Sequence, residues 1–119
     1  MDSLRVLIVE DHDDSRESLR WVLELEGHQV AVASTAGRGL SLAREFRPHV
    51  ALIDVGLPDM SGYDLVRRLR VMPECRHIRL LALTGHVSQA DRQRALEAGF
   101  DGHLAKPLDP ERLVAILAA

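Results

Sequence analysis

The chain has 119 residues, of which 46% are hydrophobic and only 3% are aromatic, and its formal net charge is −3. These values predict a single globular domain with an aliphatic core, and they exclude an intrinsically disordered chain. Acidic and basic residues are interspersed, which argues against nucleic-acid or membrane contact by this domain, and no apolar run approaches the ~20 residues of a membrane span.

Short apolar runs alternate with amphipathic segments along the whole chain. The predicted elements, in chain order, are strand 5–9, helix 14–26, strand 29–33, helix 36–46, strand 50–53, a helix from 61 to about 70, strand 78–83, a helix between Ser88 and Gly99, strand 102–105 and a helix opened by Asp109 and Pro110. Three of these helices begin at a capping-box pattern, formed by the pairs Asp14/Glu17, Ser61/Asp64 and Ser88/Asp91.

Five strand–helix alternations predict an α/β architecture. The strands are apolar on both faces, which is typical of a parallel sheet covered by helices on each side. We therefore expect one doubly wound (βα)5 domain, with a parallel five-stranded sheet in the flavodoxin-like order 2-1-3-4-5. Ligands of such sheets bind outside the carboxyl ends of the strands, so the residues that follow each strand are the candidate site.

Five polar side chains lie at the predicted strand ends, namely Glu10, Asp11, Asp54, Thr84 and Lys106. The topology brings them to one edge of the sheet. Three convergent carboxylates repel one another, and a hard dication such as Mg²⁺, which prefers oxygen ligands, relieves that repulsion. A metal, an ammonium and a hydroxyl around one carboxylate are suited to phosphoryl transfer. The residues thus predict Asp54 as a metal ligand and as a nucleophile.

The motifs "VED" (9–11), "DVGLPDMSG" (54–62), "LTG" (83–85) and "KP" (106–107) resemble those of a response-regulator receiver domain of two-component signalling. The resemblance covers essentially residues 1–119. It implies that a phosphohistidine on a histidine kinase or histidine phosphotransfer protein donates a phosphoryl group to Asp54. It also implies a phospho-accepting switch whose only reactions are its own phosphorylation and dephosphorylation.

The same resemblance assigns roles to individual positions. Asp11 would bind Mg²⁺ directly, Glu10 would act more through water, and the carbonyl of Gly56 would complete the metal site. Lys106 would pair with the acceptor carboxylate and then with the phosphoryl group, toward which Thr84 would swing. The family pattern also implies a cis Lys106–Pro107 bond, and loop-shaping roles for Pro58 and Gly62.

His103 departs from the family pattern, because this position commonly holds Tyr or Phe. Whether His103 takes over the switching role is left open. With "LAKPLDPERL" (104–113), it resembles the receivers attached to hybrid sensor kinases. A stand-alone regulator and a part of a larger kinase both remain possible readings of the sequence. The single cysteine, Cys75, allows no internal disulfide and fits a cytoplasmic location.

Trp21 and Leu25 share one face of the first predicted helix, pointing away from the stripe Leu19, Val22 and Leu23 that faces the sheet. The pair is either an exposed docking patch for a helical phosphodonor or part of the rim of the core.

Two other functions fit part of the pattern. An aspartate-nucleophile phosphatase of the dehalogenase kind generally carries a second aspartate two residues after the first, where this chain has Gly56. A pseudo-receiver, which binds partners without phosphorylation, does not need the set Asp11, Asp54 and Lys106.

Overall fold

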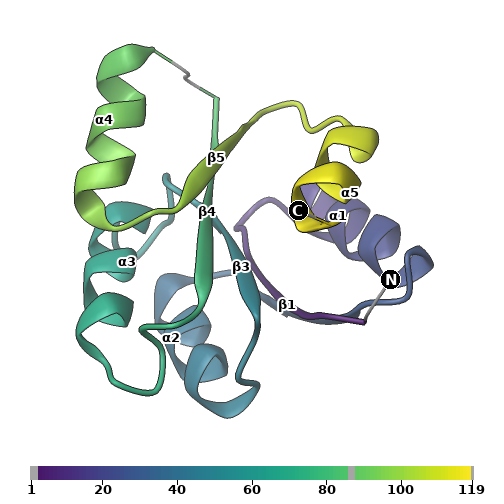
Figure 1. Ribbon diagram of the computed structural model, residues 1–119, viewed down its shortest axis with the longest axis horizontal. Helices are drawn as coiled ribbons and strands as arrows, with labels where there is room; N and C mark the ends of the chain where they lie inside the picture. Colours follow the sequence, from purple (N-terminus) through teal and green to yellow (C-terminus); the bar gives the residue numbers. More distant parts are fainter. Residues whose placement is uncertain (1–2, 86–87, 119) are drawn as a thin grey trace.

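A computed structural model describes residues 3–85 and 88–118. Five parallel strands form one sheet in the order β2-β1-β3-β4-β5, as the sequence predicted (Figure 1). The elements are β1 Arg5–Val9, α1 Asp13–Leu25, β2 Gln29–Ala33, α2 Ala36–Glu45, β3 Val50–Asp54, α3 Gly62–Val71, β4 Arg79–Thr84, α4 Gln89–Ala98, β5 Gly102–Ala105 and α5 Pro110–Ala118.

Helices cover both faces of the sheet, with α1 and α5 on one side and α2, α3 and α4 on the other (Figure 1). Alternate residues of each strand supply the two cores. In β1, Val6 and Ile8 pack in the core under α1 and α5, whereas Leu7 and Val9 pack in the core under the other three helices. The buried side chains are mainly Leu, Ile, Val and Ala, so the predicted aliphatic core is confirmed.

The helix limits confirm two of the three predicted caps. The side-chain oxygens of Ser61 and Ser88 accept hydrogen bonds from the N–H groups of Asp64 and Asp91, at the starts of α3 and α4. Gly99 ends α4 in the left-handed region with φ of 119°, where glycine has no Cβ to strain the turn.

The predicted cap at Asp14 is wrong. Helix α1 already begins at Asp13, and the N–H of Arg16 donates to the carbonyl of His12 at 2.9 Å, so the N-cap lies two residues before Asp14. His12 occupies the N-cap position without a side-chain cap hydrogen bond among the described residues. The carboxylate of Asp13 instead contacts Arg16 at 2.6 Å, so an ion pair holds this turn together.

Strands β3 and β4 each end one residue later than predicted. Asp54 pairs with Leu83 in the sheet register, and Thr84 pairs with Ala105. Both polar residues are therefore the last residues of strands, held by main-chain hydrogen bonds to neighbouring strands. Within the described ranges, none of the helices is both long and apolar enough to cross a bilayer.

Candidate functional site

Lys106 reaches the carboxyl edge of the sheet from the segment after β5. Its main-chain N–H donates to the carbonyl of Thr84 at 2.9 Å, and its bond to Pro107 is cis, as the family resemblance implied. The ammonium Nζ lies 2.8 Å from Oε1 of Glu10 and 3.1 Å from Oδ2 of Asp54. The end of the fifth strand thus meets the ends of the first and third, as the topology predicted.

The three charged groups shift one another's protonation. Burial raises the pKa of Glu10, and the adjacent Asp54 carboxylate raises it further against the opposing effect of Lys106. Burial alone would also raise the pKa of Asp54, but contacts with Glu10, the N–H of Gly56 and Lys106 hold it below its usual value. Burial opposes the charge of Lys106, yet the two carboxylates keep its pKa above the ordinary lysine value. Asp54 is therefore held as a carboxylate beside a charged ammonium.

Carboxylates of Glu10, Asp11 and Asp54, together with the imidazole of His12, each place one ligand atom within 4.8 Å of the others. Two of the carboxylate oxygens, Oε2 of Glu10 and Oδ1 of Asp11, are buried and make no hydrogen bond within the described part of the chain. Buried carboxylate oxygens normally have partners. Oxygens without partners, facing one space with excess negative charge, fit a hard dication such as Mg²⁺.

The loop after β3 fixes the Asp54 carboxylate. The N–H of Gly56 donates to its Oδ1 at 3.1 Å, while the other oxygen faces Lys106. Gly62 then packs directly against the backbone, because a Cβ built there would lie 2.5 Å from the Asp54 carbonyl oxygen. The N–H of Gly62 also donates to the carbonyl of Val55 at 2.9 Å, which closes the loop.

Thr84 and His103 lie on the α4 side of the site. Both line a cavity of about 10 Å³ with residues of α3 and α4, so little free space separates them. Thr84 is buried, with 7% of its surface exposed. Burial lowers the pKa of His103, and the nearby side chains of Arg92 and Arg112 lower it further. His103 is therefore held in its neutral form more strongly than a free histidine.

Trp21 and Leu25 are 66% and 67% exposed, so packing at the rim of the core is excluded. Helix α1 starts at the site and runs away from it, which places its last residue, Leu25, about 18 Å from Asp13 at a rise of ~1.5 Å per residue. The sequence left open whether the pair is exposed or packed at the rim of the core, and the structure shows it exposed.

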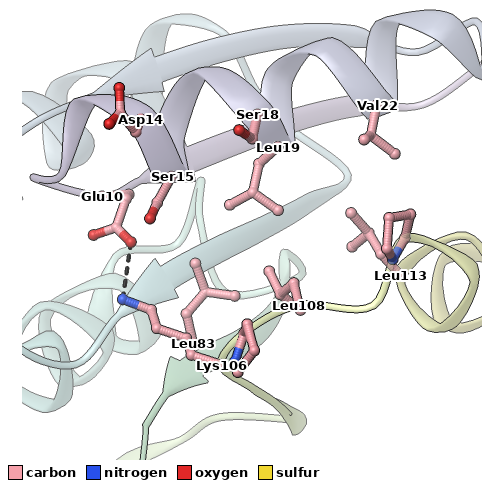
Figure 2. Close-up of a pocket in the computed structure, with 12 residues that line it drawn as sticks. Glu10, Asp14, Ser15, Ser18, Leu19, Val22, Leu83, Lys106, Leu108 and Leu113 are labelled. Atoms are coloured by element: carbon pink, nitrogen blue, oxygen red, sulfur yellow. Dashed lines mark hydrogen bonds and ion pairs between the residues drawn. The ribbon is translucent and has the colours of Figure 1, made fainter.

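A groove of about 520 Å³ begins at the site and continues between α1 and α5. Figure 2 shows Glu10 and Lys106 at one end, and Val22 and Leu113 at the other. The sequence did not predict this groove, because Leu19 and Val22 were expected to be core residues that face the sheet. They also line the groove because α1 and α5 leave a space between them, which cannot be inferred from the sequence.

Comparison with known proteins identifies the family. A profile of the response regulator receiver domain matches residues 6–118. The chain belongs to the response regulator receiver domain family. Among relatives of this receiver, the polar-differentiation response regulator DivK of Brucella anthropi is 31% identical over 109 residues, which cover 92% of this chain and 89% of DivK.

Solved structures agree with this assignment. The chemotaxis response regulator CheY4 of Vibrio cholerae superposes with a TM-score of 0.93 at 29% identity, covering 98% of each chain. A receiver domain from a sensor histidine kinase of Pseudomonas aeruginosa, solved with a magnesium ion in its active site cleft, has a TM-score of 0.89 at 29% identity, covering 98% of this chain and 95% of that one. The receiver is a phosphorylation-dependent switch of two-component signalling.

Proposed function

We propose that this receiver accepts a phosphoryl group on Asp54 from a phosphohistidine of a histidine kinase or histidine phosphotransfer protein, in a reaction that requires Mg²⁺. The observation that supports this most is the contact of Lys106 Nζ with both Asp54 and Glu10, beside two buried carboxylate oxygens that lack partners. This arrangement offers positive charge on one side of the acceptor and a cation position on the other.

In the proposed step, a carboxylate oxygen of Asp54 attacks the phosphorus of the donor. A P–O bond forms, the P–N bond to the donor imidazole breaks, and that imidazole takes up a proton as it leaves. The Lys106 ammonium stabilises charge on the phosphoryl oxygens. Asp11, Asp54 and the carbonyl of Gly56 would hold Mg²⁺, with Glu10 acting more through water, and the ion would supply further positive charge beside the phosphoryl oxygens.

The switch would follow from the new charge at Asp54. Thr84 ends the strand adjacent to β3, and we expect its hydroxyl to donate to a phosphoryl oxygen. Since Thr84 shares a small cavity with His103, its movement changes the space available to that imidazole. The face formed by α4, β5 and α5 then alters, and a neutral His103 is suited to turn inward in the role that an aromatic residue commonly fills.

We further propose that the donor approaches along the groove between α1 and α5, and that it also contacts the exposed pair Trp21 and Leu25 of α1. The groove ends at Lys106, so a donor helix seated there presents its phosphohistidine to the site.

We assign the receiver to residues 1–119 and to the cytoplasm. The solved relatives include receivers of histidine kinases as well as CheY-like chains, so both a hybrid kinase and a stand-alone regulator fit.

Phosphoramidate tests the proposed function, because its P–N bond resembles that of phosphohistidine. The protein is incubated with phosphoramidate and Mg²⁺, and its intact mass is measured. We expect the mass of the unaltered protein to increase by one phosphoryl group. We expect no mass gain when EDTA is present, and none in Asp54→Asn. Asp13→Asn is the matched control, an exposed acid close to the site, and should still be phosphorylated. A mass gain in Asp54→Asn equal to that of the unaltered protein would overturn the proposal.

A pseudo-receiver would show no mass gain at all, together with no Mg²⁺ binding. A phosphatase would release phosphate from an aryl phosphate over many turnovers, which we do not expect, because Gly56 occupies the position where such enzymes carry their acid/base aspartate.

A further inference from the structure

The imidazole of His12 faces the two carboxylate oxygens that lack hydrogen-bond partners. Its Nδ1 lies 3.6 Å from Oε2 of Glu10 and 3.5 Å from Oδ1 of Asp11. Both distances exceed the usual hydrogen-bond range of about 2.7–3.2 Å. Glu10 is fully buried, and its other oxygen is occupied by Lys106. The Nδ1 atom therefore lies close to both oxygens without forming a hydrogen bond to either.

The two distances from Nδ1 are close to the spacing of ligand atoms around a small dication. In a tetrahedral site with metal–ligand bonds of 2.0–2.1 Å, neighbouring ligand atoms lie about 3.3–3.4 Å apart. The two distances from Nδ1 fall within a few tenths of an ångström of that separation. Glu10, Asp11, His12 and Asp54 can each offer one ligand atom, and four such atoms lie within 4.8 Å of one another. The imidazole is 71% exposed, so the cation can enter from solvent.

We propose that His12 adds a nitrogen ligand to the cation site, so that the site also takes Zn²⁺ in place of Mg²⁺. This inference rests on the proposed function for the position of the cation, but not on phosphorylation. Imidazole suits Zn²⁺, whereas Mg²⁺ selects oxygen ligands and keeps several waters. A site built from oxygen and nitrogen therefore binds Zn²⁺ through a contact that Mg²⁺ does not use. Zn²⁺ would then compete with Mg²⁺ and limit phosphorylation.

Metal affinities of variants test the role of His12 directly. Zn²⁺ binding is measured by competition with a chromogenic chelator, and Mg²⁺ binding by calorimetry. In His12→Ala we expect Zn²⁺ to bind at least about tenfold more weakly, and Mg²⁺ within about twofold of the unaltered protein. His77→Ala is the matched control, an exposed histidine in the segment between α3 and β4, and should change neither affinity. The retained Mg²⁺ affinity shows that His12→Ala is folded.

Nitrogen spectra of the histidine side chains give a second readout. One equivalent of Zn²⁺ should shift the imidazole signals of His12 ahead of those of the other histidines. Unchanged Zn²⁺ affinity in His12→Ala, or a first shift at His77 instead, would overturn the inference.

Phosphorylation of the unaltered protein by phosphoramidate and Mg²⁺ is measured in parallel. If the protein is not phosphorylated but Zn²⁺ binding still depends on His12, the proposed function is wrong and the inference stands. If the protein is phosphorylated but Zn²⁺ affinity does not depend on His12, only the role of His12 is wrong.

Discussion

The ammonium of Lys106 lies 3.1 Å from Oδ2 of Asp54, at the meeting point of two strand ends that are far apart in the sequence. The same ammonium contacts Glu10 at 2.8 Å. One positive charge therefore faces three carboxylates, those of Glu10, Asp11 and Asp54, and two of their oxygens have no partner within the described residues. The excess negative charge would repel an anionic phosphoryl group, so a bound cation is needed to neutralise it.

Replacement of Gly62 should disturb the acceptor loop. In Gly62→Ala the new Cβ would lie 2.5 Å from the Asp54 carbonyl oxygen and 2.7 Å from Cα of Val55, so backbone must move. We expect a loss of about 1–3 kcal/mol in the free energy of unfolding, measured by urea denaturation, and slower phosphorylation. Gly37→Ala is the control, because its Cβ meets only the Asp59 side chain, at 3.4 Å. Equal losses in the two variants would contradict the close packing of Gly62 against the backbone of the acceptor loop.

Asp59 should make stability depend on pH. Its carboxylate accepts hydrogen bonds from the N–H groups of Ala36 at 2.8 Å and Gly37 at 2.9 Å, and these bonds lower its pKa. Because the pKa is lower in the folded state, the stabilisation is fully present above the unfolded pKa of about 3.9. It is lost as the pH falls through the folded pKa.

We therefore expect Asp59→Ala to lower the free energy of unfolding by about 0.5–1 kcal/mol at neutral pH, a modest value because the group is exposed. The difference from the unaltered protein should shrink as the pH falls below about 4. Urea denaturation over a pH series measures it. Glu45→Ala is the control, because Glu45 is an exposed acid of α2, the helix whose start Asp59 contacts, and its carboxylate lies 3.9 Å from Arg38. A pH-independent effect of Asp59→Ala would contradict the assignment.

Arg70 should be a larger contributor to stability than its surface position suggests. Its guanidinium donates to the carbonyls of Gly99, Arg76 and Ile78 at 2.8–2.9 Å, and to Asp101 at 2.7 Å. Lysine keeps the charge but cannot reproduce this planar fork. We expect Arg70→Lys to cost about 1–2 kcal/mol in urea denaturation.

Arg67→Lys is the matched control for Arg70, since Arg67 sits on the same helix and contacts only the exposed Asp64 among the described hydrogen-bonded partners. It should cost less than about 0.5 kcal/mol. If the two substitutions cost the same, the fork of Arg70 does not hold the ends of α3, α4 and β4 together.

The site was predictable from the sequence to the extent that strand ends define it. Once the parallel sheet was inferred, Asp54 and Lys106 had to share an edge, whatever the loops did. The serine caps were predictable because each contact spans only three residues. The prediction of a cap at Asp14 was wrong because the start of α1 depends on the main-chain turn after Glu10. Several acidic residues in this segment fit a cap equally well.

Other contacts were beyond sequence reasoning because they depend on how loops fold. Asp59, in the loop after β3, contacts the start of α2 more than twenty residues earlier in the chain, and Arg70 contacts main-chain carbonyls, which carry no sequence signal. The position of His12 against the unpartnered oxygens likewise depends on the turn after β1. His12 has no second histidine at the spacing of a metal site, so the sequence did not predict this contact.

Chemical localisation of the phosphoryl group tests the central claim most directly. The protein is phosphorylated with acetyl phosphate and Mg²⁺, reduced with borohydride, which converts an aspartyl phosphate to homoserine, and then analysed by peptide mass spectrometry. We predict homoserine at position 54 alone, and none when Mg²⁺ is removed. Homoserine at another acid, or an unmodified residue 54 in protein that has gained phosphate, would contradict the role of Asp54 as the acceptor.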